Sequence, residues 1–244
     1  MDATLTRSAV RDGLGVGLAV GLSGLAFGAA AVAAGLGVAQ ACALSLAAFS
    51  GASQFALVGV VAGGGNLIAG AVGAVLLGGR NGLYGLRLSE TLRVRGWRRL
   101  LTAHFVIDET TAVTTAQPSA RPARAGFWAT AISLFIAWNV ATLLGALGAA
   151  RLGSPETYGL DVVGPAAFLA LLWPRLTIGR TERRVAVIAA LVAVTATPLL
   201  PSGVPVMLAA AAALAGVVRR TPGPRQDDRS ETEHRLATVS EENP

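Results

Sequence analysis

Hydrophobic residues fill most of the chain in long stretches that short polar gaps interrupt. No charged residue occurs between Gly13 and Arg80, a run about three times the roughly 20 residues with which a helix crosses a bilayer. We expect about seven to eight hydrophobic helical segments, at residues 13–36, 38–61, 66–86, 100–117, 126–150, 162–178, 185–200 and 203–218. The pattern predicts an all-α, polytopic integral membrane protein in which some segments are broken or re-entrant.

Composition and charge agree with this prediction. Of the 244 residues 53% are hydrophobic and only 14% are charged, whereas a soluble domain has about 25% charged residues. The basic residues are all arginine, the net charge is +6, and the arginines gather in gaps near 87–99, 121–124, 175–184 and 219–220. Such gaps are typical of loops on the inner face of a membrane. Apart from Trp97, no aromatic residue lies among these arginines, and the repeated interleaving that would stack bases is absent, so we expect a bilayer and no nucleic acid as partner.

The chain divides into three parts. Residues 1–12 form a short N-terminal tail, residues 13–218 form the transmembrane domain, and residues 219–244 lack an apolar face, which predicts a disordered cytoplasmic tail. Basic gaps flank segment 100–117 on both sides, so a re-entrant or broken segment there would keep both gaps inside. Counting the crossings back from these gaps places the N-terminus outside, unless the first segment breaks near Ser23 and Gly24.

The adjacent acidic residues Asp108 and Glu109 are the sharpest chemical feature. One carboxylate at the bilayer centre costs about 2.5–3.5 kcal/mol on insertion scales, so both must face protein or water. We interpret the pair as a proton relay or as a site for the ammonium group of a substrate; the alternative is a short loop at the membrane interface. Adjacent residues of a helix point about 100° apart, so at most one should face the substrate.

The second hydrophobic segment contains small and polar residues in its middle: Ser50, Gly51, Ser53 and Gln54. Such residues commonly mediate contacts between membrane helices. The alternative is a discontinuous helix whose free amide groups bind a substrate carboxylate.

Arg80 and His104 are further polar residues near the acidic pair. Arg80 either extends to the membrane interface or pairs with Asp108 or Glu109, because intramembrane charges usually neutralise one another. His104 shares a helical face with Asp108 if that stretch is helical, and a packing role is an equal alternative.

Signatures of enzymes are missing from the sequence. HExxH, CxxC, GxSxG and a phosphate-binding loop are all absent, so we expect no enzyme, no cofactor and no bound metal. Two alternatives to a transporter stay open. One is a membrane scaffold or regulatory subunit of another transporter, and the other is a lipid-acting enzyme that uses Asp108, Glu109 and His104.

An ordered set of short motifs resembles the AzlC-type family, the large subunit of branched-chain amino acid exporters. The motifs are Gly24-x-x-Phe27-Gly28, FSGASQF at 49–55, Arg80-x-x-Leu-Tyr-Gly85, Asp108-Glu109, Trp138 with Leu144-Gly145, Gly159-Leu160-Asp161 and FLALL at 168–172. The resemblance covers about residues 13–218. It departs from the family's usual pattern where Gly78 and Asn81 replace an asparagine and a histidine, and where Ser23-Gly24 stands in place of a proline.

The resemblance implies a secondary transporter in the inner membrane of a bacterium. It would export leucine, isoleucine and valine, with methionine as a further substrate, together with a small AzlD-type membrane subunit. Together with the polar residues described above, the resemblance implies substrate binding by Ser50, Gly51, Ser53, Gln54, Asp108 and Glu109. It implies ion coupling through Asp108, Glu109 and Arg80.

Overall fold

The computed structural model describes residues 2–152 and 179–200, with isolated positions between 166 and 177 and between 204 and 211. Within these ranges every element is a helix: α1 (Asp2–Gly21), α2 (Gly24–Ala33), α3 (Val38–Ala47), α4 (Gly51–Ala62), α5 (Leu67–Gly78), α6 (Arg80–Leu92), α7 (Arg98–His104), α8 (Asp108–Thr115), α9 (Ala120–Arg151) and α11 (Arg180–Ala196). The predicted all-α class is confirmed there. Most of segments 162–178 and 203–218, the 159–161 motif and the tail at 219–244 lie outside the described residues, so the count of seven to eight segments stays a prediction.

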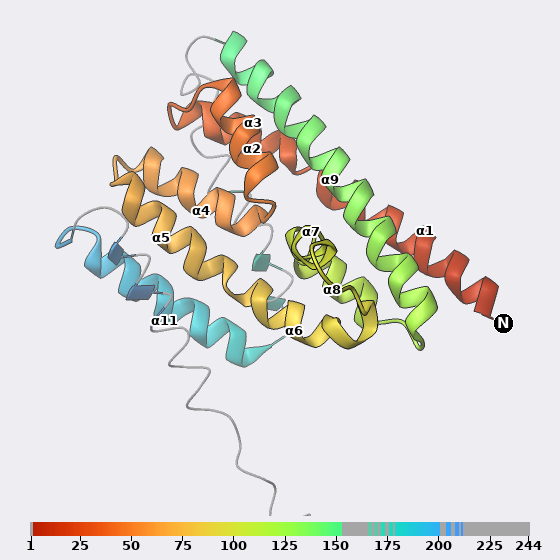
Figure 1. Ribbon diagram of the computed structural model, residues 1–244. Helices are drawn as coiled ribbons and strands as arrows, with labels where there is room; N and C mark the ends of the chain where they lie inside the picture. Colours follow the sequence, from red (N-terminus) through yellow and green to blue (C-terminus); the bar gives the residue numbers. More distant parts are fainter. Residues whose placement is uncertain are drawn as a thin grey trace, which may run out of the picture.

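Among the described residues, three stretches are long and apolar enough to cross a membrane: Asp2–Ala33, Leu67–Leu92 and Ala120–Arg151. The first consists of α1 and α2, and the second consists of α5 and α6 (Figure 1). Only Leu22 and Ser23 interrupt the first span, between the end of α1 at Gly21 and the start of α2 at Gly24, so the segment continues across this point as one span. At this interruption the Ser23 hydroxyl donates a hydrogen bond to the carbonyl of Val20.

Small residues pack the first span closely against α9. The touching pairs, in chain order, are Gly13 with Thr130, Gly17 with Ser133, Gly21 with Ala137 and Gly28 with Thr142. From one pair to the next, the residue numbers increase in both the first span and α9. The two helical stretches therefore run parallel, side by side (Figure 1). Spacings of four between glycines let membrane helices approach closely, which explains much of the glycine content of the first segment.

The second hydrophobic segment folds as a hairpin, with a break at residues 48–50 between α3 and α4. Ser45 in α3 bonds Thr142 near the end of α9, at 3.3 Å between the hydroxyl oxygens. After the break α4 runs antiparallel to α5, because Gly70 contacts Val60 whereas Gly78 contacts Ser53. The segment therefore enters from one end of the molecule and returns to it. Of the two alternatives for this segment, the helix is discontinuous, and the binding of a substrate carboxylate there stays a prediction.

The segment at 100–117 forms a second hairpin at the opposite end of the molecule. Its helices α7 and α8 are separated by residues 105–107, which confirms the expected break. Nε of Arg124, at the start of α9, donates to the carbonyl oxygen of Thr91 at 2.7 Å. The basic gaps before and after this hairpin therefore lie together, as the sequence predicts.

The N-terminus shares this basic end, because Arg121 lies 3.5 Å from Asp2. The count of crossings, which assigned the N-terminus to the other side, is wrong because it treated segment 38–61 as a full crossing. Helices α1–α4 and α5–α8 thus follow the same plan in opposite directions: a span and then a hairpin. Opposed repeats of this kind are common in secondary transporters.

Candidate functional site

A cavity of about 710 Å³ lies where the breaks of the two hairpins and of the second span meet. The starts of α4, α6 and α8 contribute Ser50, Gly51, Ala52, Arg80, Asn81, Asp108 and Glu109 to its wall, and the apolar remainder consists of Val20, Phe49, Leu77, Ile107, Leu134, Trp138, Leu169 and Leu172. Its size is typical of ligand pockets. Three helices, α4, α6 and α8, begin at this cavity.

The beginning of α4 offers uncapped backbone amides to the cavity. The Ser50 side chain does not cap the helix; its hydroxyl donates to Oγ of Ser53 at 3.2 Å instead. The N–H groups of a first helical turn have no partner inside the helix, and they carry the positive end of the helix dipole. Because Ser50, Gly51 and Ala52 all line the cavity, this turn is suited to a carboxylate.

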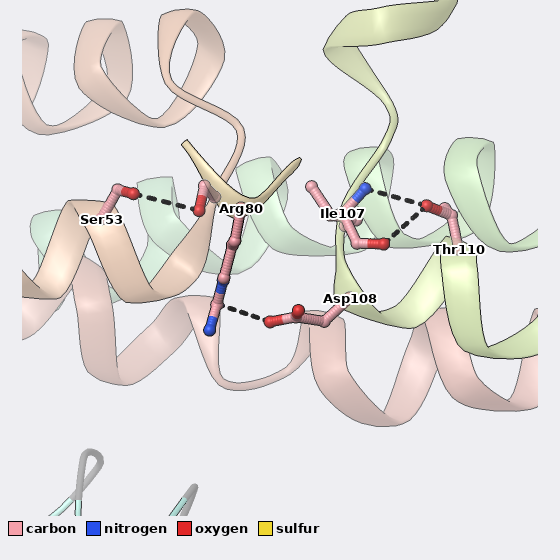
Figure 2. A network of polar contacts seen from close by, with 6 residues as sticks. Ser53, Arg80, Ile107, Asp108 and Thr110 are labelled. Atoms are coloured by element: carbon pink, nitrogen blue, oxygen red, sulfur yellow. Dashed lines mark hydrogen bonds and ion pairs between the residues drawn. The ribbon is translucent and has the colours of Figure 1, made fainter. Parts of the chain in front are cut away.

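Arg80 and Asp108 form an ion pair on the cavity wall. Nη2 of Arg80 lies 2.5 Å from Oδ2 of Asp108, and the two side chains point toward one another (Figure 2). The side chains are 35% and 31% exposed. The pair resolves the alternatives for Arg80 in favour of Asp108, and no ion pair to Glu109 occurs in the part of the chain that the structure describes.

Both acidic side chains border the cavity, although at most one was expected to do so. The expectation assumed a continuous helix, but Asp108 and Glu109 form the first turn of α8. At a helix end that opens into a cavity, neighbouring side chains can reach the same space. Asp108 is paired with Arg80, which leaves Glu109 as the carboxylate of the two that has no cation in contact among the described residues.

Thr110 fixes the backbone that presents the two acids. Its side chain is fully buried. The Ile107 N–H donates to Oγ1 of Thr110 at 3.0 Å (Figure 2), and that hydroxyl also lies 2.8 Å from the carbonyl oxygen of Phe105. One hydroxyl therefore satisfies backbone groups that the break between α7 and α8 would leave unpaired.

His104 lies on the other side of this break. Its ring stacks on Phe49 at 5.9 Å and also contacts Phe105 and Phe135 edge-on. Since α7 ends at His104, the histidine does not share a helical face with Asp108. Its contacts are those of a packing residue.

Two of the expected site residues, Ser53 and Gln54, are not part of the cavity wall. Gln54 is fully buried: Nε1 of Trp138 donates to its Oε1 at 3.0 Å, and its Nε2 donates to the carbonyl oxygen of Ala48 at 2.9 Å. Gln54 therefore joins the break before α4 to α9. Ser50, Gly51, Arg80, Asp108 and Glu109 do line the cavity, as expected of a common site.

Sequence reasoning gave no site role to Asn81 and Trp138, which also line the cavity. Oδ1 of Asn81 is buried and has no hydrogen-bond partner in the described part of the chain. The available signal was a polar side chain next to Arg80 inside an apolar segment. For Trp138 it was the indole N–H, which needs a partner when buried.

Comparison with known proteins yields a family match. The model of the family described as AzlC protein matches residues 15–152, which is more than half of the chain. The matched range contains α2–α9 entirely and nearly every residue of the cavity wall. No curated protein and no solved structure matches the chain.

Proposed function

This chain belongs to the AzlC family, and on that premise we propose that it is the large subunit of a two-component secondary transporter. The transporter exports leucine, isoleucine and valine, with methionine as a further substrate. It works in the inner membrane of a bacterium beside a small AzlD-type subunit, with the tail at 219–244 in the cytoplasm. It performs no enzymatic step and needs no organic cofactor. The three membrane-length apolar stretches of the described residues support a membrane location.

One observation carries the proposal: a single cavity combines an uncapped helix start, a free carboxylate and an apolar wall. The substrate carboxylate binds the first-turn amides at Ser50 and Gly51. The ammonium group binds Glu109. The branched side chain lies against Phe49, Leu77 and Trp138. A zwitterion with an apolar side chain uses each of these features, which supports an aliphatic amino acid as ligand.

Proton coupling acts through the acidic pair in this proposal. Asp108 is paired with Arg80, so the two charges offset one another on the cavity wall. A proton on Glu109 removes the negative charge that holds the ammonium group. Proton binding from one side then releases the amino acid, so that proton influx drives export.

The test is transport by the purified protein, reconstituted in liposomes with its small partner subunit. Labelled leucine is measured with and without a proton gradient, for the parent and for Glu109→Gln and Asp108→Asn. Asp12→Asn, an exposed acid in α1, is the matched control. We expect the gradient to accelerate leucine transport in the parent and the control, and neither site variant to show this acceleration.

Two results would count against the proposal. A parent that moves no branched-chain amino acid would favour a scaffold or regulatory subunit. Full, gradient-driven transport by both site variants would exclude the proposed coupling while leaving the transporter assignment standing.

A further inference from the structure

A second cavity, a groove of about 810 Å³, lies between α6 and α7. Its α6 side contains Gly82, Gly85 and Ser89, and its α7 side contains Thr102 and Ala103. Leu92 at the end of α6 and the loop residues 93–95 also line it, so the groove reaches the basic end of the molecule. It is separate from the central cavity described above, and the proposed binding mode makes no use of it.

The two cavities meet at Asn81. This residue lines both of them. Beside it, Val106 lines the groove while the next residue, Ile107, lines the central cavity. The partition between the two spaces is therefore about one side chain thick. The buried Oδ1 of Asn81, without a partner in the described residues, is at this partition.

We propose that the groove between α6 and α7 is the route by which the amino acid reaches the central cavity from the basic end, with Asn81 as the residue it passes. The inference rests on the proposed transport function. It adds the side from which substrate enters and the residue that separates the outer groove from the binding site. For an exporter, the basic end is the cytoplasmic end that must admit substrate.

The charges along the groove suit this role. Arg93, Arg95 and Arg99 line it, against the single acid Glu90. Nε of Arg93 donates to the carbonyl oxygen of Glu90 at 3.3 Å, which holds that arginine at the rim. A positive mouth raises the local concentration of carboxylates, and the free carboxyl group of an amino acid is attracted there before its ammonium group meets Glu109.

The α6 wall of the groove is open at two glycines, Gly82 and Gly85, which have no side chains. Asn81, Gly85 and Ser89 recur every four residues, so they form one stripe along the helix. A Cβ atom added at Gly82 or at Gly85 would meet no atom within 4 Å. The glycines therefore leave free width along the line that leads to Asn81. The same free space makes these positions suitable for probes.

The experiment places a thiol in the groove. Cys42 is the only cysteine, so Cys42→Ala gives a cysteine-free parent. Gly85→Cys is added to it, and Gly73→Cys in α5, where a Cβ also meets nothing within 4 Å and which lines neither cavity, is the control. Both variants are reconstituted with the small partner subunit and treated with a bulky maleimide. Leucine transport and the labelled fraction, by mass, are then measured.

We expect labelling of Gly85→Cys to reduce leucine transport about tenfold or more, because the width of a route limits what passes it. The Gly73→Cys control should be unaffected, and excess leucine should slow the labelling of Gly85→Cys. Asn81→Leu, tested without any introduced cysteine or label, should also reduce leucine transport. A Gly85→Cys thiol that does not react, or a labelled variant that transports at the unlabelled rate, would overturn the proposed route.

Two further outcomes separate this inference from neighbouring ones. If neither the native chain nor the cysteine-free parent transports leucine, the transport function itself is contradicted. Protection of Gly85→Cys by phosphatidylglycerol vesicles but not by phosphatidylcholine vesicles, with no effect of leucine, would identify a site for anionic lipid. That result would also overturn the route.

Discussion

Arg80 and Asp108 are 28 residues apart in sequence, yet their side chains meet at 2.5 Å. The pair joins the middle of the second span to the tip of the second hairpin. Removal of one partner leaves a charge without its counterion, which is worse than removal of both. This asymmetry gives the first prediction.

Arg80→Ala and Asp108→Ala should each lower the melting temperature of the purified protein, and the double variant should lower it by less than the sum. The double-mutant cycle on the free energy of unfolding should give a coupling free energy between the two side chains of about 0.5–3 kcal/mol, as for residues in contact. The same cycle on Arg11 and Asp12, an exposed pair at 3.8 Å, should give a coupling near zero. Purely additive effects at Arg80 and Asp108 would contradict the ion pair.

Gln54 should matter for stability more than for affinity. Gln54→Ala removes the acceptor of the Trp138 indole N–H and the donor to Ala48, and each buried group left unpaired costs about 1–3 kcal/mol. We expect a lower melting temperature but a nearly unchanged leucine affinity, because Gln54 lies behind the cavity wall.

The control for Gln54 is Gln40→Ala, whose exposed side chain accepts only from the Gly37 N–H and should change little. A large loss of affinity in Gln54→Ala at unchanged stability would show instead that Gln54 contacts the substrate directly.

Gly51 should not tolerate a methyl group. A Cβ there would lie 2.9 Å from Cη2 of Trp138, so the ring or the start of α4 must move. Overpacking of this kind costs about 1–3 kcal/mol, and it also displaces the amides proposed to bind the carboxylate. We expect Gly51→Ala to weaken both stability and leucine binding.

Gly59→Ala, in the same helix, is the matched control for Gly51. Its Cβ meets nothing within 4 Å, and alanine is favoured over glycine in a helix by about 0.8–1.0 kcal/mol. Equal effects of the two substitutions on thermal stability would contradict the close contact between Gly51 and Trp138.

The helical stretches and the breaks near Ser50 and Asp108 have local causes in the sequence, whereas the break at Gly79 between α5 and α6 was not predicted. Uncharged runs predict spans, and polar residues inside such runs, as at Ser50 and Asp108, predict breaks. The return of the chain to the side from which it entered could be predicted for only one of the two hairpin segments. Segment 100–117 has arginines on both flanks, which indicate its return, whereas segment 38–61 has no charges on either flank. Its return depends on contacts such as Ser45 with Thr142, 97 residues apart.

The residues that line the cavity could be predicted only in part, because their orientation also depends on contacts between distant segments. Sequence position placed Ser50, Ser53 and Gln54 together, but a helix start presents only some of its side chains to a cavity. Which ones face it depends on α9, since Trp138 binds Gln54 from behind. Asn81 joins the site because α7 and α8 leave space on both sides of it, a relationship between distant segments that periodicity does not contain.

Asn81 supplies the last prediction, which concerns pH. Histidine gains its charge between about pH 5 and pH 8, so Asn81→His introduces a group that titrates in the physiological range. Asn81 adjoins Arg80 and shares the cavity with Asp108 and Glu109. A protonated histidine there adds a positive charge on the proposed path of the substrate ammonium group. Leucine transport by Asn81→His should therefore fall as the pH is lowered through this range.

The measurement is leucine counterflow at equal pH on both sides of the liposome, which removes the driving force of a proton gradient. As the pH is lowered across the titration of the introduced histidine, the leucine counterflow rate of Asn81→His relative to that of the parent should fall by about tenfold. A tenfold change corresponds to about 1.4 kcal/mol. Asn81→Gln, which has a similar size but no titrating group, should keep a constant ratio. A constant ratio for Asn81→His as well would mean that the substrate does not pass Asn81, since a charge placed on its path must change the rate.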